Sequence, residues 1–207
     1  MISLTDRFKY DVFLSFRGED TRYGFTGNLK KALDDKGVRT FIDDEELQKG
    51  NEITPTLLKA IEDSMMAIVV LSENYAFSSF CLQELSKILD TMKDKVGRSV
   101  LPVFYKVDPS DIRKLKRSHG EAMAQHQKRS NSNMDLLQKW KNALNQVANL
   151  SGFHYKGYIP IFCFHLFCRV KYSPPSYISS LFEFYMLVKE FKVKYVFDPY
   201  KYVNFLF

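Results

Sequence analysis

Residues 66–71 read Met-Ala-Ile-Val-Val-Leu (MAIVVL), and this run indicates the fold class. All six side chains are apolar, with no polar residue at alternate positions. A strand with one face in water alternates between apolar and polar residues, whereas a strand covered on both faces is apolar throughout. The run therefore predicts a central strand of a parallel sheet that has helices on both faces.

Short apolar runs and helical patterns alternate on either side of this strand. Further strands are expected at Tyr10–Phe16, residues 38–42, Ser99–Tyr105 and residues 150–154. Helical spacing of apolar residues predicts helices near residues 20–35, 54–63, 78–95, 119–127 and 135–150, with residues 107–116 as a loop. This alternation predicts an α/β fold of the flavodoxin-like class, with a five-stranded parallel sheet in the order 2-1-3-4-5. Pro102 cannot donate a ladder hydrogen bond, so the fourth strand is expected near an edge.

Three loops are expected at the carboxyl edge of this sheet, where open parallel sheets bind ligands. They are residues 17–20, 43–52 and 72–79. In the first loop, Gly18 allows close approach of the backbone to a ligand, and the Arg17 guanidinium suits a phosphate. A turn arginine that is paired with Glu19 or Asp20 and exposed to solvent is the alternative interpretation.

Glu84 is the acid of most chemical interest, because it lies in the first turns of the helix after the third strand. A fixed carboxylate at that place can accept hydrogen bonds from a ribose or stabilise a transition state that resembles an oxocarbenium ion. Spacing alone favours a plainer interpretation, in which Glu84 is solvated or pairs with Lys87 three residues later.

The remaining reactive groups form no catalytic or metal-binding motif. Cys81 is expected to be a small buried residue, and the three cysteines fit no zinc spacing. No Walker or Rossmann glycine pattern is present, so neither a metal nor a bound cofactor is predicted. The four histidines and the acidic run at residues 43–46 carry no motif: His119, His126, His154 and His165. The basic set Arg113, Lys114, Lys116 and Arg117 is expected to be a solvated face, with a phosphate or RNA contact as the alternative.

The composition is that of an ordinary globular domain, except that aromatic residues gather in one segment. Residues 153–207 hold 18 of the 31 aromatic residues and a net charge of +4 out of +6. The first 152 residues are nearly neutral, which does not support nucleic acid as the default partner of the main domain. The longest apolar stretch, residues 158–168, is about half of the ~20 residues that a membrane span needs, and residues 1–6 lack a signal-peptide pattern.

Five segments in order resemble the plant Toll/interleukin-1 receptor (TIR) domain family. They are residues 10–22 (YDVFLSFRGEDTR), residues 38–43 followed by residues 47–53 (LQKGNEI), residues 68–84 (IVVLSENYAFSSFCLQE), residues 99–109 (SVLPVFYKVDP) and residues 140–152 (WKNALNQVANLSG). The resemblance covers residues 8–154 and agrees with the fold expected from the apolar pattern.

The resemblance implies an enzyme that hydrolyses the nicotinamide–ribose bond of NAD⁺ or NADP⁺, with the dinucleotide as substrate and no cofactor. The family's catalytic glutamate falls on Glu84, expected to bind the ribose hydroxyls and stabilise the oxocarbenium-like state. The nucleotide site would be lined by Phe16, Arg17, Gly18, Ser78 and Phe80, with Lys49 and Gly50 in the mobile loop at residues 43–52.

Three departures from the family pattern stand out. Phe80 replaces the usual tryptophan, which leaves less area for stacking on the nucleotide. Gly27 and Asn28 replace a serine–histidine pair that packs in the family's self-association interface, and a mid-helix glycine costs about 1 kcal/mol relative to alanine. The family's final helix is missing or replaced, so a TIR domain is predicted at residues 8–154 and a non-TIR, aromatic-rich tail at residues 155–207.

Two hypotheses of function follow from the resemblance. One is an NAD(P)⁺ glycohydrolase in plant innate immune signalling that acts when TIR domains assemble, with lipase-like immune signalling proteins responding to its nucleotide product. The other is a non-catalytic interaction module, or adaptor, for other TIR receptors. No nucleotide-binding switch domain or leucine-rich repeat follows in the sequence, which predicts a TIR-only protein or a truncated receptor. The resemblance and the missing targeting signals predict a cytoplasmic location, with the nucleus as an alternative.

Overall fold

The computed structural model describes residues 8–43, 54–93, 95–129 and 134–155. All of them belong to one compact unit, Met1–Phe164. The predicted loop at residues 43–52 lies outside the described residues from residue 44 onward, as does the tail from residue 156. The predicted boundary between a domain and a tail at residue 154 therefore stays a prediction.

The described strands form one parallel sheet, which confirms the predicted order. They are β1 (Tyr10–Phe16), β2 (Thr40–Ile42), β3 (Ser64–Leu71), β4 (Ser99–Tyr105) and β5 (Phe153–Tyr155), arranged β2-β1-β3-β4-β5. Each neighbouring pair is parallel. β4 is next to the edge strand β5, the near-edge place that Pro102 predicted.

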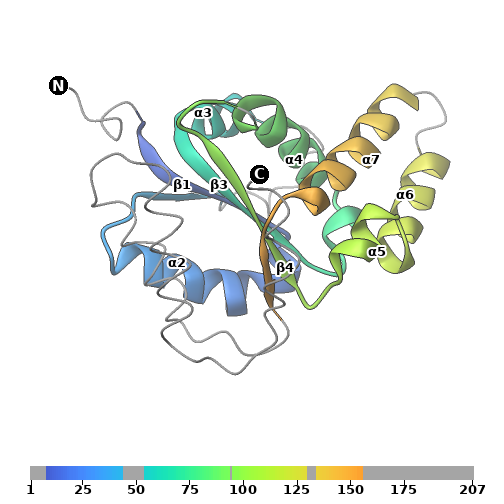
Figure 1. Cartoon of the computed structure of the whole chain (residues 1–207), viewed down its shortest axis with the longest axis horizontal. Coiled ribbons are helices and arrows are strands. Elements are labelled where there is room, and N and C mark those ends of the chain that lie inside the picture. The colour runs from blue at the N-terminus through green and yellow to red at the C-terminus, as the bar shows by residue number, and fades with distance from the viewer. Residues whose placement is uncertain (1–7, 44–53, 94, 130–133, 156–207) are drawn as a thin grey trace, which may run out of the picture. The chain divides into compact units, whose positions relative to one another are not determined.

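Helices cover both faces of the sheet, as Figure 1 shows with α2 on one side and α3 and α4 on the other. The larger helices are α2 (Gly27–Asp34), α3 (Pro55–Glu62), α4 (Ser79–Met92), α6 (Arg117–Arg129) and α7 (Met134–Asn149). Ala67, Val69 and Leu71 of β3 pack in one core with α3, α4, α6 and α7. The alternate residues Ile68 and Val70 point to the face that α2 covers, and both are fully buried. The continuous apolar run is thus explained by two covered faces.

The first predicted helix is broken in the structure. A short helix α1 (Gly18–Thr21) is followed by a wide π-helical turn η2 (Arg22–Thr26), and only then by α2. Gly24 lies at the kink with φ −138° and ψ −107°. At Gly27 an added Cβ would lie 2.6 Å from the Arg22 carbonyl oxygen, so the close backbone approach in this turn requires a glycine there.

Smaller differences from the sequence-based expectation also have local causes. The strand expected at residues 38–42 begins at Thr40, because Gly37 has φ +70° and the Val38 amide still donates to the Leu33 carbonyl of α2. The loop expected at residues 107–116 was wrong in part, since it contains helix α5 (Pro109–Arg113). Asp108 caps α5 by accepting a hydrogen bond from the Ser110 amide at 2.7 Å.

Candidate functional site

The site is built at the carboxyl ends of β1 and β3, two neighbouring strands in which Phe16 lies opposite Val70. Phe16 is the last residue of β1 and is buried. Its ring lies 5.0 Å from the guanidinium carbon of Arg22. Arg17 follows as the residue before α1, and Gly18 opens that helix. The two loops predicted at residues 17–20 and 72–79 therefore meet at this edge, because their strands are adjacent.

The Arg17 side chain is held within its own loop. Its Nη1 donates to Asp20 Oδ1 at 2.5 Å, and its Nη2 forms an ion pair with Glu19. The Arg17 side chain is only 21% exposed, while that of Glu19 is 76% exposed. The alternative interpretation was therefore right about the partners, while the Arg17 side chain is only partly exposed to solvent. The contact with Glu19 is weak in energy, because surface ion pairs contribute about 0–1 kcal/mol.

Ser78 and Phe80 lie at the start of α4. Ser78 caps this helix by accepting a hydrogen bond from the Cys81 amide at 3.2 Å. The half-buried Phe80 packs against the hydrophobic core. Cys81 is fully buried, as expected, and its Sγ lies 3.6 Å from the Phe16 carbonyl oxygen. The first turn of α4 is thus in contact with the end of β1.

Glu84 follows Cys81 by three residues, so both lie on one face of α4, about a helical turn apart. Its side chain is only 3% exposed, which contradicts the interpretation of a solvated helix glutamate. Lys87 pairs instead with Glu62 of α3 at 2.8 Å, so the predicted i,i+3 pair was also wrong. That contact lowers the pKa of the exposed Glu62 carboxyl through its hydrogen bond from Lys87.

Tyr75 organises the loop after β3, and the sequence reasoning missed it. Its buried hydroxyl lies 2.9 Å from the Ser15 hydroxyl of β1 and donates to the Cys81 carbonyl oxygen at 3.1 Å. One hydroxyl therefore joins β1, the short turn η4 (Tyr75–Phe77) and α4. The signal that could have found this contact was Ser15, a lone small polar residue in the otherwise apolar second half of β1.

Two buried histidines of α6 belong to no catalytic motif, and one of them contacts this loop. His126 of α6 donates from Nε2 to the Ala76 carbonyl oxygen at 2.9 Å, and its ring lies 5.1 Å from Trp140 of α7. His119 is buried near the start of α6, where burial lowers its pKa to about 4 despite the opposing charge of Asp111. Both lie in helix α6, and neither belongs to a predicted site.

The other predicted residues are not brought into this site by the described structure. Lys49 and Gly50 lie outside the described residues. In the basic set, Arg113 donates to the Ala148 carbonyl oxygen at 2.9 Å and Arg117 pairs with Asp111 at 3.2 Å. Among the described residues, no group of three metal-ligating side chains is found, and no helix is long and apolar enough to cross a membrane.

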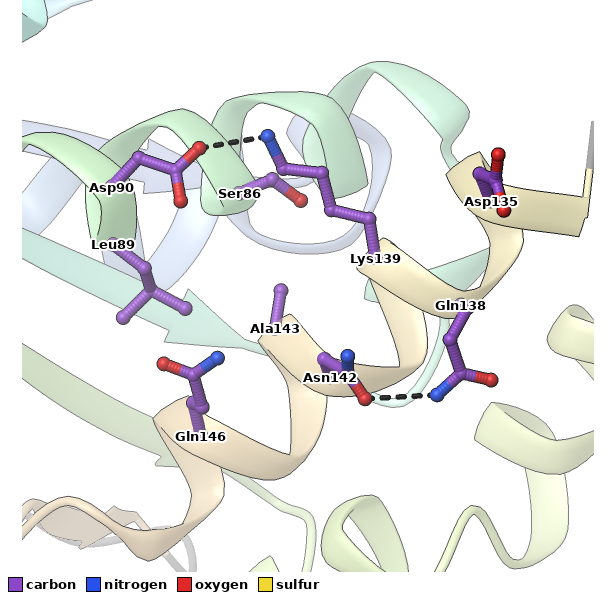
Figure 2. Close-up of a pocket in the computed structure, with 9 residues that line it drawn as sticks. All are labelled: Ser86, Leu89, Asp90, Asp135, Gln138, Lys139, Asn142, Ala143 and Gln146. Atoms are coloured by element: carbon purple, nitrogen blue, oxygen red, sulfur yellow. Dashed lines mark hydrogen bonds and ion pairs between the residues drawn. The ribbon is translucent and has the colours of Figure 1, made fainter.

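A separate polar groove of about 300 Å³ lies between α4 and α7 (Figure 2). Figure 2 shows Lys139 of α7 reaching to Asp90 of α4, and the two groups are 2.7 Å apart. Of the predicted site residues that the structure describes, Glu84 included, none lines this groove. Ligand pockets are mostly apolar and enclosed. The polar lining here fits a solvated seam between two helices better than a substrate site.

Comparison with known proteins gives one consistent family. The family model described as "TIR domain" matches residues 9–159. Disease resistance protein RPV1 of Vitis rotundifolia is 53% identical over 145 residues, which cover 70% of this chain and 10% of that protein. TMV resistance protein N of Nicotiana glutinosa is 49% identical over 150 residues, covering 72% of this chain and 13% of that protein. The chain thus spans about a tenth of the length of these curated relatives.

A solved structure gives the same result for the fold. The TIR domains of the activated Roq1 resistosome, which directly recognizes the pathogen effector XopQ, are 47% identical to this chain with a TM-score of 0.66. The match covers 70% of this chain and 87% of that one.

Proposed function

The chain belongs to the TIR domain family, and from this membership we propose that it is an NAD(P)⁺ glycohydrolase of plant innate immune signalling. The reaction is NAD⁺ plus water giving nicotinamide, ADP-ribose and a proton. The bond between the ribose C1′ and the nicotinamide nitrogen breaks, and nicotinamide leaves as a neutral molecule. Positive charge then develops on the ribose, and water adds at C1′.

One observation carries the proposal: Glu84 is buried one helical turn beyond the contact between Cys81 and the end of β1. A carboxylate in a site with little water is well placed to favour a developing cation, because electrostatic interactions are stronger in a medium of low dielectric constant. We assign Glu84 the binding of the ribose hydroxyls and the stabilisation of the oxocarbenium-like state. Phe16, Arg17, Gly18, Ser78 and Phe80 are assigned to the nucleotide, together with Lys49 and Gly50.

Arg17 has to change one partner in this proposal. Its guanidinium is shared between Asp20, which is largely buried, and Glu19, which is exposed. A phosphate of the dinucleotide would replace Glu19, since that contact is the weaker of the two in water. The contact with Asp20 would remain and hold the arginine in place.

The alternative function is a non-catalytic interaction module for other TIR proteins. The observation that favours it is again Arg17, because both of its neighbouring acids are already bound to it. Gly27 at the wide turn η2 and the exposed Asn28 further alter a surface that the family uses to assemble. Under either function we propose TIR domains as partners. With the enzymatic function we propose lipase-like signalling proteins that respond to its nucleotide product. From the family resemblance we propose a cytoplasmic location, with the nucleus as the alternative.

The deciding experiment measures nicotinamide release from NAD⁺ and NADP⁺ by the full chain at high protein concentration. The variants are Glu84→Gln and Glu84→Ala, and the matched control is Glu73→Gln, an exposed glutamate in the loop after β3. We expect release by the parent and the control, and a loss of about 100-fold or more in the Glu84 variants. Equal release by the parent and Glu84→Gln would remove Glu84 from its role. No release by the parent, with binding to another TIR domain retained, would favour the interaction module.

A further inference from the structure

A single carboxylate connects the two loops of the candidate site. Asp20 Oδ2 accepts hydrogen bonds from the Ser72 hydroxyl at 2.5 Å and from the Asn74 amide at 3.3 Å. Its Oδ1 accepts from Arg17 Nη1 at 2.5 Å and from Asn74 Nδ2 at 3.4 Å. Arg17 lies in the same loop after β1 as Asp20 itself. Ser72 and Asn74 lie in the loop after β3, 52 and 54 residues from Asp20 in sequence.

The chemistry of this contact requires a carboxylate. An ionised aspartate accepts at about four lone-pair sites and donates nothing, which matches four donors from three residues. An asparagine has nearly the same shape, but it would present an NH₂ group to either the arginine or the serine. The Asp20 side chain is 11% exposed and Ser72 is 2% exposed, so solvent replaces little of what is lost.

The contact continues from the loop after β3 to the Glu84 helix. The Tyr75 amide donates to the Ser72 carbonyl at 3.2 Å, and the Tyr75 hydroxyl donates to the Cys81 carbonyl in the first turn of α4. Glu84 stands three residues further along that helix. Asp20 is therefore in direct contact with Arg17 on one side and, through Ser72 and Tyr75, linked to the helix that carries Glu84 on the other.

We propose that Asp20 is a positioning residue that joins the arginine of the nucleotide site to the loop leading into the Glu84 helix. The proposal rests on the proposed NAD(P)⁺ glycohydrolase function for its kinetic consequences. In this proposal Asp20 contacts neither the nicotinamide–ribose bond that breaks nor the nicotinamide that leaves. It sets the direction of the Arg17 guanidinium, which affects substrate binding, and the position of the loop before α4, which affects bond cleavage.

The kinetic test compares Asp20→Asn, Ser72→Ala and the double variant in the full chain, with Asp35→Asn as a matched control. Asp35 is an exposed acid that pairs only with Lys31 in the described contacts, at 3.1 Å. We expect Asp20→Asn to raise KM and lower kcat, with a loss of about 10-fold to 100-fold in kcat/KM. Ser72→Ala should lower kcat more than it raises KM, because Arg17 keeps its contact with Asp20. Asp35→Asn should match the parent.

The double variant distinguishes positioning from a general loss of structure. If Ser72 acts through Asp20, the double variant should lose no more than about twofold beyond Asp20→Asn alone. If the losses in kcat/KM of the two single variants multiply in the double variant, the two residues act independently and Ser72 does not act through Asp20. Unchanged kinetics of Asp20→Asn would overturn the proposal. All variants are assayed at a temperature at which they are fully folded, so a fall in kcat cannot come from a smaller folded fraction.

Hydrogen exchange tests the same contact without any catalytic activity. Amide exchange in the peptide that covers residues 72–78 should become about tenfold faster in Asp20→Asn and stay unchanged in Asp35→Asn. If the parent releases no nicotinamide but this peptide is deprotected, the proposed function fails and the joining of the two loops stands. Unchanged exchange in Asp20→Asn would overturn the joining role even in an active enzyme.

Discussion

Replacing Tyr75 by phenylalanine should destabilise the domain by about 2 kcal/mol. The substitution removes one hydroxyl and leaves the ring, so no large cavity is created. The hydroxyl that is lost bonds both Ser15 and Cys81, and both it and the Ser15 side chain are fully buried. The Tyr75 hydroxyl donates to the Cys81 carbonyl, and therefore accepts the proton of the Ser15 hydroxyl.

The magnitude follows from what each partner loses. A net intramolecular hydrogen bond contributes about 0.5–1.5 kcal/mol, while a buried donor left without an acceptor costs about 1–3 kcal/mol. The Ser15 hydroxyl is such a donor in Tyr75→Phe, whereas the Cys81 carbonyl keeps its place in the helix. For a domain of this size, about 2 kcal/mol corresponds to a fall in Tm of about 4–8 °C.

Urea unfolding followed by tryptophan emission measures this change. Trp140 is the single tryptophan of the chain and is buried, so its emission reports loss of the core. Tyr23→Phe is the matched control, because Tyr23 is 95% exposed and the same atom is removed. The double variant Ser15→Ala/Tyr75→Phe should lose less than the sum of the two single changes, since it removes the stranded donor as well. A loss below about 0.5 kcal/mol in Tyr75→Phe would refute the argument from buried hydrogen bonds.

Two further predictions concern His119 and the wide turn η2. Burial lowers the pKa of His119 from 6.5 to about 4, so the unfolded chain takes up the proton more readily than the folded one. The contribution of neutral His119 to the free energy of unfolding should be fully present above about pH 6.5. As the pH falls towards 4, the free energy of unfolding should decrease by up to about 3 kcal/mol. The measurement is urea unfolding at a series of pH values, and His119→Gln should show a flatter pH profile; a profile as steep as the parent's would assign the effect to other groups. Gly27→Ala should destabilise by about 1 kcal/mol in thermal unfolding, because the new Cβ meets the Arg22 carbonyl oxygen at 2.6 Å and the clash outweighs a gain in helix propensity of about 1 kcal/mol. A stabilised Gly27→Ala would show that the turn relaxes into a regular helix at little cost.

Most of the fold could be predicted from the sequence because its signals are local. The apolar run at residues 66–71 identified a central strand, and Pro102 identified a strand next to the edge. Thr54 and Ser78 each cap the helix that follows, with hydrogen bonds from the Leu57 and Cys81 amides. The break of the first helix at Gly24 could not be read from spacing, because Phe25, Leu29 and Leu33 fit one continuous helical stripe.

The candidate site could be predicted only as a set of residues. The rule for open parallel sheets selected the loops after β1 and β3, and these loops do meet. Spacing alone favours a solvated or paired Glu84 side chain, whereas the structure shows a buried one. Its catalytic role stays a proposal that rests on the family and on that burial. Asp20 was named only as a possible partner of Arg17. Its contacts with Ser72 and Asn74, and the contacts of Tyr75, were missed because spacing along the chain does not indicate them.

The sequence by itself determined the α/β class and predicted the sheet order, because hydrophobic periods of two and 3.6 residues are properties of neighbouring positions in the chain. The family came from a different signal, the ordered motif segments between residues 10 and 152. Only the tertiary structure decided which polar groups bind one another. Asp20 meets Ser72, and Ser15 meets Tyr75, across 52 and 60 residues of chain. Such pairs form because parallel strands place their carboxyl ends together, where a buried polar group must bond to whichever donor or acceptor the neighbouring strand and its loop bring within reach.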